Sequence, residues 1–446
     1  MENIGMLLSI NSFLCSGAVG VFKFSVLTLC IAISSLLTGC ATNPVTGRFD
    51  LSLLDQKEQI ELGNSQYKRA IQHQGGAYSV NPAITAYVRD VGFRLVKESH
   101  QPDLPFEFTV INSSIPNAWA LPGGKIAINR GLILLLKDEA QLAAVLGHEI
   151  VHVTAQHSAQ SFSKSKAVHI SSIALQSIAG DFASVVGAGA NISGSLFLAK
   201  YNREHELDAD FYGTQYISKA GYDPEASIEL QTIFLALSKN KTEKKGRMAA
   251  LFASHPPSTE RVEKNTETAR NLSGNTRNKL TYSTQMATIL KDKAAYAEYD
   301  NAVILSQETK FEPAMESIER AIHIQPQESI FWELKGDLHY YQGAKQLSLN
   351  CYKQAISLNP TFFQHHLARA ILYVDLGQYS EAKTDLIAAN KIYTTRMGVF
   401  YLGEVAFEQK EIRAALDYYT LLAKSDDKWG NISQQRLDFI AKSYAN

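Results

Sequence analysis

The 446-residue sequence predicts a mainly helical α+β protein whose C-terminal part is an all-α solenoid. In the segment 138–160, apolar residues recur at the spacing of a buried helix: Leu142, Val145, Leu146, Ile150 and Val153. In the segment 117–128, Ile126 and Ile128 alternate as they would in a strand, which indicates a small sheet. Toward the C-terminus, three alanines recur at intervals of 34 residues, as in stacked pairs of helices: Ala321, Ala355 and Ala389.

The composition is that of a globular protein and does not favour nucleic-acid binding. Hydrophobic residues make up 45% of the chain and charged residues 20%, and the formal net charge is −1. At roughly 100–200 residues per domain, the length allows more than one hydrophobic core. Because the sequence has neither a basic arm nor an overall positive charge, we expect no nucleic-acid partner.

Residues 1–39 have the layout of a secretory signal peptide. Lys23 precedes an apolar run over residues 24–36, which is too short for a comfortable membrane span. The run ends in Leu-Thr-Gly-Cys40, which resembles a bacterial lipobox, so we expect cleavage before Cys40 and lipidation of its thiol. Ala41 favours anchoring in the outer membrane, with the chain in the periplasm. An ordinary cleaved signal, an uncleaved anchor and a later start codon stay open.

The helix expected at residues 138–160 carries the motif His148-Glu149-x-x-His152. Histidines at i and i+4 project from one face of a helix, so both imidazoles can reach one metal ion. Glu149 lies beside them, where a carboxylate can take a proton from water at the ion. The alternative is a buried helix with incidental histidines, but two unpaired histidines in a core would be costly.

A third metal ligand has to come from elsewhere, because catalytic zinc takes three protein ligands and leaves one position open. The acidic segment 203–210 offers Glu206 and Asp210, at i and i+4 on a helix. One carboxylate can bind the metal while the other supports a ligand. The alternative is a solvated acidic helix face, against which the apolar residues after this segment argue.

The pattern R-x-x-E-x-x-A-D at residues 203–210, downstream of HExxH, resembles the gluzincin peptidases of the CAAX prenyl protease and HtpX type. The resemblance covers about residues 50–265 and implies a zincin-like metallopeptidase domain with a small edge sheet. It implies that Glu149 is catalytic and that Asp210 orients a ligand or donates a proton. It also implies one zinc ion per chain, bound by His148, His152 and Glu206.

Residues 117–128 resemble the edge strand of this family, which pairs with the backbone of the substrate. The resemblance places Asn117, Gly123 and Gly124 in that strand, where the glycine pair would let two main chains approach. Residues 167–198 are apolar but broken by glycine and serine, so we expect a packed helix and a mobile loop there rather than a membrane-spanning pair.

The segment Ser-His255-Pro-Pro resembles a family element near the active-site cleft. His255 could act there as a fourth ligand that keeps the enzyme latent, or as a hydrogen-bond donor to the oxyanion of the reaction. The alternative is a loop histidine held by Glu260 or Arg261. His157 is expected to be a surface or packing residue rather than a ligand.

The C-terminal region resembles tetratricopeptide repeats. Besides the alanines, Pro326 and Pro360 lie 34 residues apart, and so do Gly343 and Gly377. Small residues let paired helices approach closely, and proline ends the second helix of each unit. Such repeats form a concave groove for protein partners, whereas a plain helical bundle, the alternative, has none.

We therefore expect a signal peptide (1–39), a lipidated tether (40–60), the zinc metallopeptidase domain (61–270), a linker (271–292) and the helical repeats (293–446). Together these parts resemble the periplasmic lipoprotein proteases of the BepA type. The resemblance implies a zinc endopeptidase in outer-membrane protein quality control and assembly. Its partners would be unfolded or misassembled outer-membrane proteins and their insertion machinery. The rival function is an assembly chaperone or scaffold with a structural or mostly latent zinc site, and Glu149 favours the enzyme.

Overall fold

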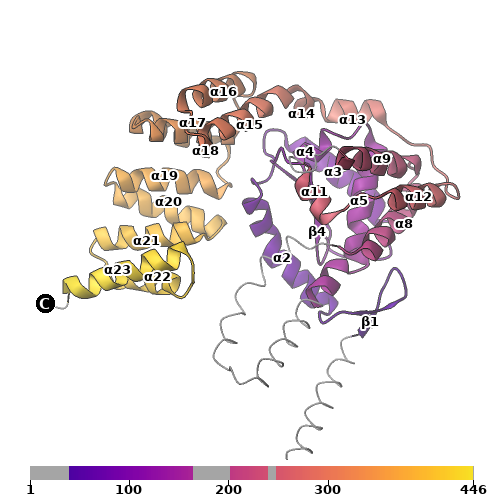
Figure 1. Ribbon diagram of the computed structural model, residues 1–446, viewed down its shortest axis with the longest axis horizontal. Coiled ribbons are helices and arrows are strands. Elements are labelled where there is room, and N and C mark those ends of the chain that lie inside the picture. The colour runs from indigo at the N-terminus through magenta and orange to yellow at the C-terminus, as the bar shows by residue number, and fades with distance from the viewer. Residues whose placement is uncertain (1–39, 164–200, 240–247, 445–446) are drawn as a thin grey trace, which may run out of the picture.

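The computed structural model describes residues 40–163, 201–239 and 248–444. Figure 1 shows a mixed part, coloured from indigo to rose, beside a ladder of helical pairs that runs from orange to yellow. This is the mainly helical α+β fold with a C-terminal helical solenoid that the sequence predicts. The expected signal peptide and the helix and loop expected at 167–198 lie outside the described residues.

Residues 40–51 form a hairpin in which β1 (Cys40–Thr42) pairs antiparallel with β2 (Phe49–Leu51). Between the strands, the buried Asn43 side chain donates a hydrogen bond to the carbonyl oxygen of Ala155 at 2.9 Å, and Val45 joins the hydrophobic core. The expected tether is therefore wrong for this stretch, because buried groups dock it onto the rest of the fold. Lipidation of Cys40 stays a prediction.

The sheet has three strands, β3 (Glu107–Ile111), β4 (Ala118–Leu121) and β5 (Lys125–Asn129). Their order is β3-β5-β4, with β3 parallel and β4 antiparallel to β5. The segment that was expected to form an edge strand thus contains one, β4, and also the central strand of the sheet. Tyr67, from the helix that precedes the sheet, donates to the carbonyl oxygen of Ile126 at 2.6 Å and fixes its position.

The glycine pair lies in the turn between β4 and β5, which corrects its expected place in an edge strand. Gly123 and Gly124 have φ of +73° and +92°, a backbone conformation that favours glycine. A Cβ on Gly123 would lie 2.5 Å from the Cα of Ile60, and one on Gly124 would lie 3.0 Å from the Cα of Phe106. The glycines therefore admit close approach of the chain's own backbone.

The described helices of the mixed part are α2 (Gln56–His73), α3 (Pro82–Val96), α4 (Arg130–Ile133), α5 (Glu139–Thr154), α8 (Arg203–Lys219), α9 (Glu225–Lys239), α11 (Ala249–Ser254) and α12 (Thr259–Ala269). Helices α2, α3, α4 and α5 contact the sheet, and the others pack outside them or lie farther along the chain. Helix α5 is central, because α3, α8, α9 and β4 all pack against it. Its N-cap Asp138 accepts a hydrogen bond from the Gln141 amide at 2.9 Å, which satisfies a free helix-end donor.

The expected linker at 271–292 is folded onto the mixed part rather than extended. It contains α13 (Lys279–Gln285) and α14 (Ala287–Lys291). Tyr282 is buried and its hydroxyl donates to the carbonyl oxygen of Ile133 at 2.8 Å. Arg277 contacts Asp138, the N-cap of α5, with Nε 2.9 Å from Oδ2. This segment therefore supports the start of α5.

The C-terminal part consists of antiparallel helix pairs and a final helix, which confirms the tetratricopeptide prediction. The helices are α15 (Lys293–Gln307), α16 (Phe311–Ile324), α17 (Ser329–Tyr341), α18 (Lys345–Leu358), α19 (Phe363–Asp375), α20 (Tyr379–Ile392), α21 (Arg396–Glu408), α22 (Ile412–Ala423) and α23 (Lys428–Tyr444). The periodic alanines are buried where the second helix of each pair meets the first: Ala321, Ala355 and Ala389.

The first repeats pack directly against the mixed part through what we call the repeat interface: Asn112, Arg130, Tyr296 and Glu328. The Asn112 amide donates to Glu328 Oε2 at 3.1 Å, and the Tyr296 hydroxyl donates to the same oxygen. The guanidinium carbon of Arg130 lies 3.2 Å from the centre of the Tyr296 ring. One continuous hydrophobic core includes residues of both parts. Across the described ranges, none of the helices combines the length and apolarity that a membrane crossing requires.

Candidate metal centre

Helix α5 places His148, Glu149 and His152 in the interior, as the i, i+4 spacing predicts. His152 and Glu149 are buried, whereas the side chain of His148 keeps 12% of its exposure. Burial lowers the pKa of His152 well below its ordinary value, so this imidazole is neutral. A neutral imidazole has a free nitrogen lone pair, which is the form that binds a metal ion.

Helix α8 brings Glu206 to these histidines because it crosses α5 at a pair of glycines. A Cβ on Gly147 would lie 3.1 Å from the Gly213 carbonyl oxygen, and a Cβ on Gly213 would lie 3.0 Å from the His148 amide nitrogen. Only residues without a side chain allow the two backbones to approach so closely. The N-cap Asn202 fixes the start of α8 by accepting from the His205 amide at 2.8 Å.

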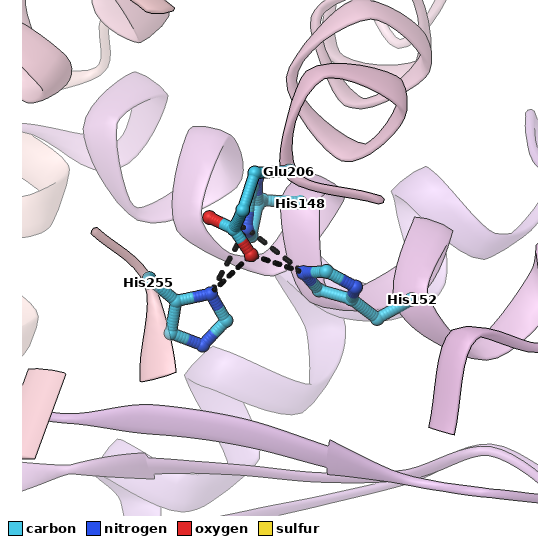
Figure 2. A group of neighbouring side chains, drawn as sticks. All are labelled: His148, His152, Glu206 and His255. Atoms are coloured by element: carbon cyan, nitrogen blue, oxygen red, sulfur yellow. Dashed lines mark hydrogen bonds and ion pairs between the residues drawn. The ribbon is translucent and has the colours of Figure 1, made fainter. Parts of the chain in front are cut away.

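Four donor groups converge where α5, α8 and the end of α11 meet, as Figure 2 shows. His148 Nε2 lies 3.0 Å from His152 Nε2 and 3.3 Å from His255 Nδ1. Glu206 Oε1 lies 3.3 Å from His152 Nε2 and 3.1 Å from His255 Nδ1. One donor atom from each of the four residues lies within 4.8 Å of all the others.

These separations fit a tetrahedral metal ion. With ligands at about 2.0–2.1 Å, neighbouring donor atoms around zinc lie about 3.3–3.4 Å apart. The orientation of His148 agrees, because its Nδ1 lies 3.0 Å from Asp210 Oδ1. An ionised carboxylate only accepts, so His148 carries its proton on Nδ1 and turns the lone pair of Nε2 toward the other donors. The residues present therefore fit a bound metal.

Arg261 neutralises the two acids that α8 contributes. Its Nε and NH2 donate to the two oxygens of Asp210 at 2.7 and 2.8 Å, and its NH1 lies 2.6 Å from Glu206 Oε2. Burial alone would raise the pKa of Glu206, but the charge of Arg261, followed by those of His255 and His148, holds it well below its ordinary value. Burial is likewise outweighed by Arg261 at Asp210, whose pKa is lowered. Both carboxylates are thus ionised.

Glu149 differs from these acids because no guanidinium of the described residues contacts it. Burial raises its pKa, and the nearby charges of His255 and His148 oppose that rise only in part. Its Oε1 lies 3.6 Å from His255 Nε2, and its Oε2 is buried without a hydrogen-bond partner among the described residues. The unpartnered oxygen faces a site that has room for a water molecule or a substrate group.

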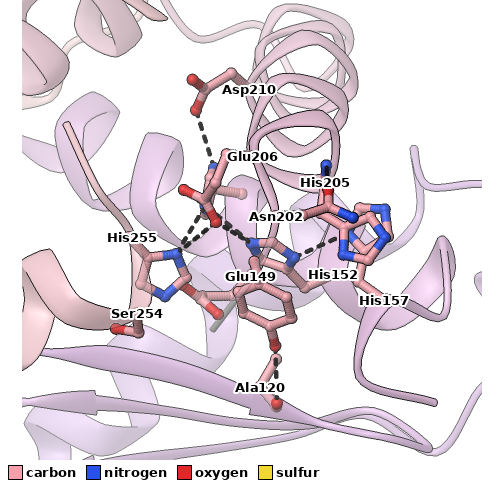
Figure 3. Close-up of polar contacts among 12 residues, drawn as sticks. Ala120, Glu149, His152, His157, Asn202, His205, Glu206, Asp210, Ser254 and His255 are labelled. Carbon is pink, nitrogen blue, oxygen red and sulfur yellow. Dashed lines mark hydrogen bonds and ion pairs between the residues drawn. The ribbon is translucent and has the colours of Figure 1, made fainter. Parts of the chain in front are cut away.

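His255 is the C-cap residue of α11, and Figure 3 shows its ring pointing at Glu206. It is buried, and Glu206 and then Glu149 raise its pKa against the effect of burial. The Arg261 side chain donates to the carbonyl oxygen of Pro256 rather than to the His255 ring. His255 therefore belongs to the donor cluster and is not simply a loop histidine held by Glu260 or Arg261.

The first part of the chain matches a known peptidase family. Peptidase family M48 matches residues 82–269, and tetratricopeptide repeat families match residues 331–362 and 351–384. Residues 82–269 are an M48 metallopeptidase domain.

Relatives of known name share one or both parts of the chain. The beta-barrel assembly-enhancing protease of Escherichia coli (strain K12) is 26% identical over 451 residues, which cover 89% of this chain and 90% of its own. The mitochondrial metalloendopeptidase OMA1 of Schizosaccharomyces pombe is 30% identical over 231 residues, 50% of this chain and 64% of its own. Among solved structures, a thermophilic TPR protein of Thermus thermophilus aligns at 20% identity over 35% of this chain and 89% of its own, with a TM-score of 0.30.

The metal centre of the M48 domain adjoins the sheet. A mostly apolar cavity of about 40 Å³ opens beside His148 and Glu149, and Ala118, the first residue of β4, lines it. Asn117 precedes that strand, and its Oδ1 is buried without a partner among the described residues. Among the described residues that line this cavity, Ala118 of the edge strand β4 is the one that belongs to the sheet.

Sequence reasoning did not find the aromatic side of the M48 site. The Tyr201 ring stacks on His152 with 3.7 Å between centroids and 13° between planes. Tyr201 precedes the acidic motif by two residues, and no spacing rule marks it. His157, which was expected at the surface or in packing, is buried with Nδ1 2.9 Å from His152 Nδ1. It therefore packs in the interior and contacts His152.

Proposed function

We propose that the M48 domain is a zinc-dependent endopeptidase whose ion is bound by His148, His152 and Glu206. The observation that carries this proposal is the convergence of these three donors, 3.0–3.6 Å apart, with Glu149 beside them. Two imidazoles and one carboxylate are a ligand set that catalytic zinc sites use. The same donor set also binds non-haem iron(II), so the proposal of zinc rests on Glu149 within the HExxH motif and on the match to a metallopeptidase family as well as on the donors.

Bound zinc would polarise the peptide carbonyl and lower the pKa of a water molecule toward neutrality. Glu149 would accept a proton from the attacking water and later give it to the leaving amine. Its raised pKa suits both transfers, because a group that holds a proton more tightly than a free carboxylate is a better base. Asp210, itself held by Arg261, keeps the His148 ring in the orientation and tautomer that the ion requires.

His255 has two roles open to it, and the donor cluster favours the first. With Nδ1 3.1 Å from Glu206 Oε1 and 3.3 Å from His148 Nε2, it occupies the fourth corner of the ligand set. As a fourth ligand it would fill the position that substrate needs and keep the enzyme latent. Turned away from the ion, it would donate to the oxyanion of the reaction.

The cellular role is proposed from the relative in Escherichia coli, whose name describes an assembly-enhancing protease for β-barrels. We place this chain in the periplasm, anchored to the outer membrane by a lipid at Cys40. The repeats would recruit unfolded or misassembled outer-membrane proteins and their insertion machinery. Edge strand β4, with Asn117 before it, would pair with the substrate backbone. Mass spectrometry of the N-terminus tests the lipid, and an unmodified Cys40 would remove it from the proposal.

The rival proposal is an assembly scaffold with a latent zinc site, which a permanently bound His255 would favour. Metal analysis and proteolysis separate the two. The purified mature protein should contain one zinc per chain, and the double variant His148→Ala, Glu206→Ala should contain none. The parent should cleave an unfolded outer-membrane protein that Glu149→Gln leaves intact. Equal cleavage by the two, or none by the parent and by His255→Ala, would favour the scaffold.

A further inference from the structure

The two ligand histidines of α5 have different partners on the nitrogen that faces away from the metal. His148 Nδ1 faces the Asp210 carboxylate, whereas His152 Nδ1 lies 2.9 Å from Nδ1 of His157. If His152 offers Nε2 to a metal ion, its proton is on Nδ1. His157 Nδ1 then has to accept that proton's hydrogen bond, so the proton of the neutral His157 ring is on Nε2.

A left-handed residue makes this contact available. Side chains five residues apart on one continuous helix point about 140° apart, so His157 could not meet His152 if α5 continued. Helix α5 ends at Thr154, and Gln156 adopts φ +58°, a conformation that side-chain-bearing residues seldom take. This turn carries His157 back beneath the helix end. Gln156 thus adopts an unfavourable backbone conformation at the position where that conformation brings the His152 and His157 rings together.

A second buried histidine supports the His157 ring. His205 of α8 stacks on it with 4.2 Å between centroids and 7° between planes, and both residues are buried. His205 Nε2 lies 3.1 Å from the amide oxygen of Gln160, which can only accept, so His205 donates there. Figure 3 shows His152, His157 and His205 in succession beside the start of α8.

The N-terminal hairpin lies at the far end of this chain of contacts. Gln160 Nε2 donates to Asp50 Oδ2 at 2.9 Å and to the Ala155 carbonyl oxygen at 2.9 Å. Asn43 donates to the same Asp50 oxygen at 2.8 Å and also to the Ala155 carbonyl oxygen. The hairpin therefore holds both Gln160 and the turn that precedes His157.

We propose that His157 is a positioning residue of the metal centre, which accepts a hydrogen bond from the Nδ1–H group of His152. The N-terminal hairpin holds His157 through Asp50, Gln160 and His205. This inference rests on the proposed zinc site. The partners that orient a metal-bound histidine typically contribute 10- to 100-fold to metal affinity. The hairpin begins at Cys40, so the segment that carries the expected lipid anchor also supports His152.

Two variants of the full mature protein separate the hydrogen bond from the packing. His157→Asn keeps an acceptor oxygen close to the position of Nδ1 but loses the ring, and His157→Phe keeps a ring against His205 but has no acceptor. Zinc affinity is measured by competition with a chromophoric chelator, and the absorption spectrum of the cobalt-substituted protein reports the ligand geometry. We expect His157→Phe to lose about 10- to 100-fold in zinc affinity with an altered cobalt spectrum. His157→Asn should stay near the parent.

Parent-like affinity in His157→Phe overturns the proposal, and so does an equal loss in both variants, which would mean that the ring only packs. His365→Phe is a matched control, because His365 is equally buried but lies in the repeats. Its zinc affinity should not change. If the parent itself binds no zinc, the proposed function fails rather than this inference.

The role of the hairpin is tested by Asp50→Ala, alone and combined with His157→Phe. We expect a smaller loss of zinc affinity from Asp50→Ala alone, and little further loss when it is added to His157→Phe, because both act through one ring. Additive losses would show that the hairpin acts independently of His157 and would remove it from the proposal.

Discussion

The buried acids Glu206 and Asp210 of the M48 domain and the half-buried Asp337 of the repeats have different neighbours. Glu206 and Asp210 share Arg261, and the pKa of each lies below its ordinary value although burial acts the other way. In the repeats, burial and then the charge of Glu333 raise the pKa of Asp337 to about 7, and the hydrogen bond from Tyr352 opposes the rise only in part. A buried acid is thus ionised where a cation is buried with it, and otherwise tends to hold its proton.

The difference follows from what each of these acids does. A carboxylate can bind a metal ion only when it is ionised, so the M48 domain keeps Arg261 beside Glu206. A repeat needs only packed helices, and a protonated Asp337 can accept from Tyr352 while it lacks a charge. Glu149 differs from Glu206 and Asp210, since burial raises its pKa as it does for Asp337. An acid that exchanges a proton with water suits that environment.

The largest expected effect comes from substitution of Glu149. Glu149→Gln preserves size but removes the proton acceptor, so peptide cleavage should fall by about 10²–10⁴-fold. Zinc content and thermal midpoint should stay at parental values. Turnover of an unfolded protein substrate, measured alongside zinc content, checks this. Parental turnover would mean that Glu149 is a buried acid without a catalytic task.

Removing Arg261, which contacts both Glu206 and Asp210, should lower the stability of the protein and not only its activity. Arg261→Met leaves two buried carboxylates without their counter-charge, and breaking a buried pair typically costs about 3–5 kcal/mol. Urea unfolding of the metal-free protein measures it. The matched control is Arg203→Met, because Arg203 pairs with Glu260 at the surface, with 72% of its side chain exposed. Such pairs contribute about 0–1 kcal/mol. Similar losses in the two variants would contradict the special place of Arg261.

The variant His255→Ala tests whether the His255 ring lowers the basal proteolytic activity. The ring is held by Glu206 and Glu149, so His255→Ala frees the fourth position of the ligand set. We expect basal proteolysis to rise several-fold while zinc stays bound. A fall in rate with zinc retained would instead assign His255 to the oxyanion, and an unchanged rate would leave it a structural residue.

The smallest effect concerns pH and the repeats. Because the pKa of Asp337 is raised from 3.8 to about 7, its contribution to stability is fully present below about pH 4 and is lost as the pH rises through 7. The variant Asp337→Asn lacks this loss. Relative to the parent, its urea midpoint should therefore improve between pH 5 and pH 8.

The matched control for this pH effect is Asp385→Asn. Arg369 outweighs burial and lowers the pKa of Asp385, so its contribution is already complete at pH 5. Asp385 also raises the pKa of His366, so parent and variant are compared in a His366→Gln background, where the difference in midpoint should not change from pH 5 to pH 8. An identical pH trend in both variants would refute the assignment to Asp337.

Local spacing predicted the parts of the site that lie within one helix, and packing decided the rest. His148, Glu149 and His152 follow from the turn of α5, and Glu206 from a motif in α8. The crossing at Gly147 and Gly213 that joins them has no local signature, because each glycine matters only when the other faces it.

The supporting residues were harder to predict for the same reason. Arg261 lies 51 residues from Asp210, and no periodicity connects them. The position of the His157 ring depends on the left-handed conformation of Gln156. Glutamine is not a residue type that predicts such a turn. The repeats were predicted from their period, but their docking was not, because Glu328 and Asn112 are far apart in the chain.

The repeat interface would fix the distance between a protein bound by the repeats and the candidate metal centre. On a long flexible linker, a captured protein samples a wide volume, and its effective concentration at the enzyme depends on linker length. Here Glu328 and Tyr296 fasten the first repeats to Asn112 and Arg130, which directly follow strands β3 and β5. A segment gripped by the repeats would therefore present its bonds at a set distance from the metal centre. Two properties of a bound protein would then decide where it is cleaved. One is the distance of a peptide bond from the segment that the repeats bind, and the other is the side chains around that bond.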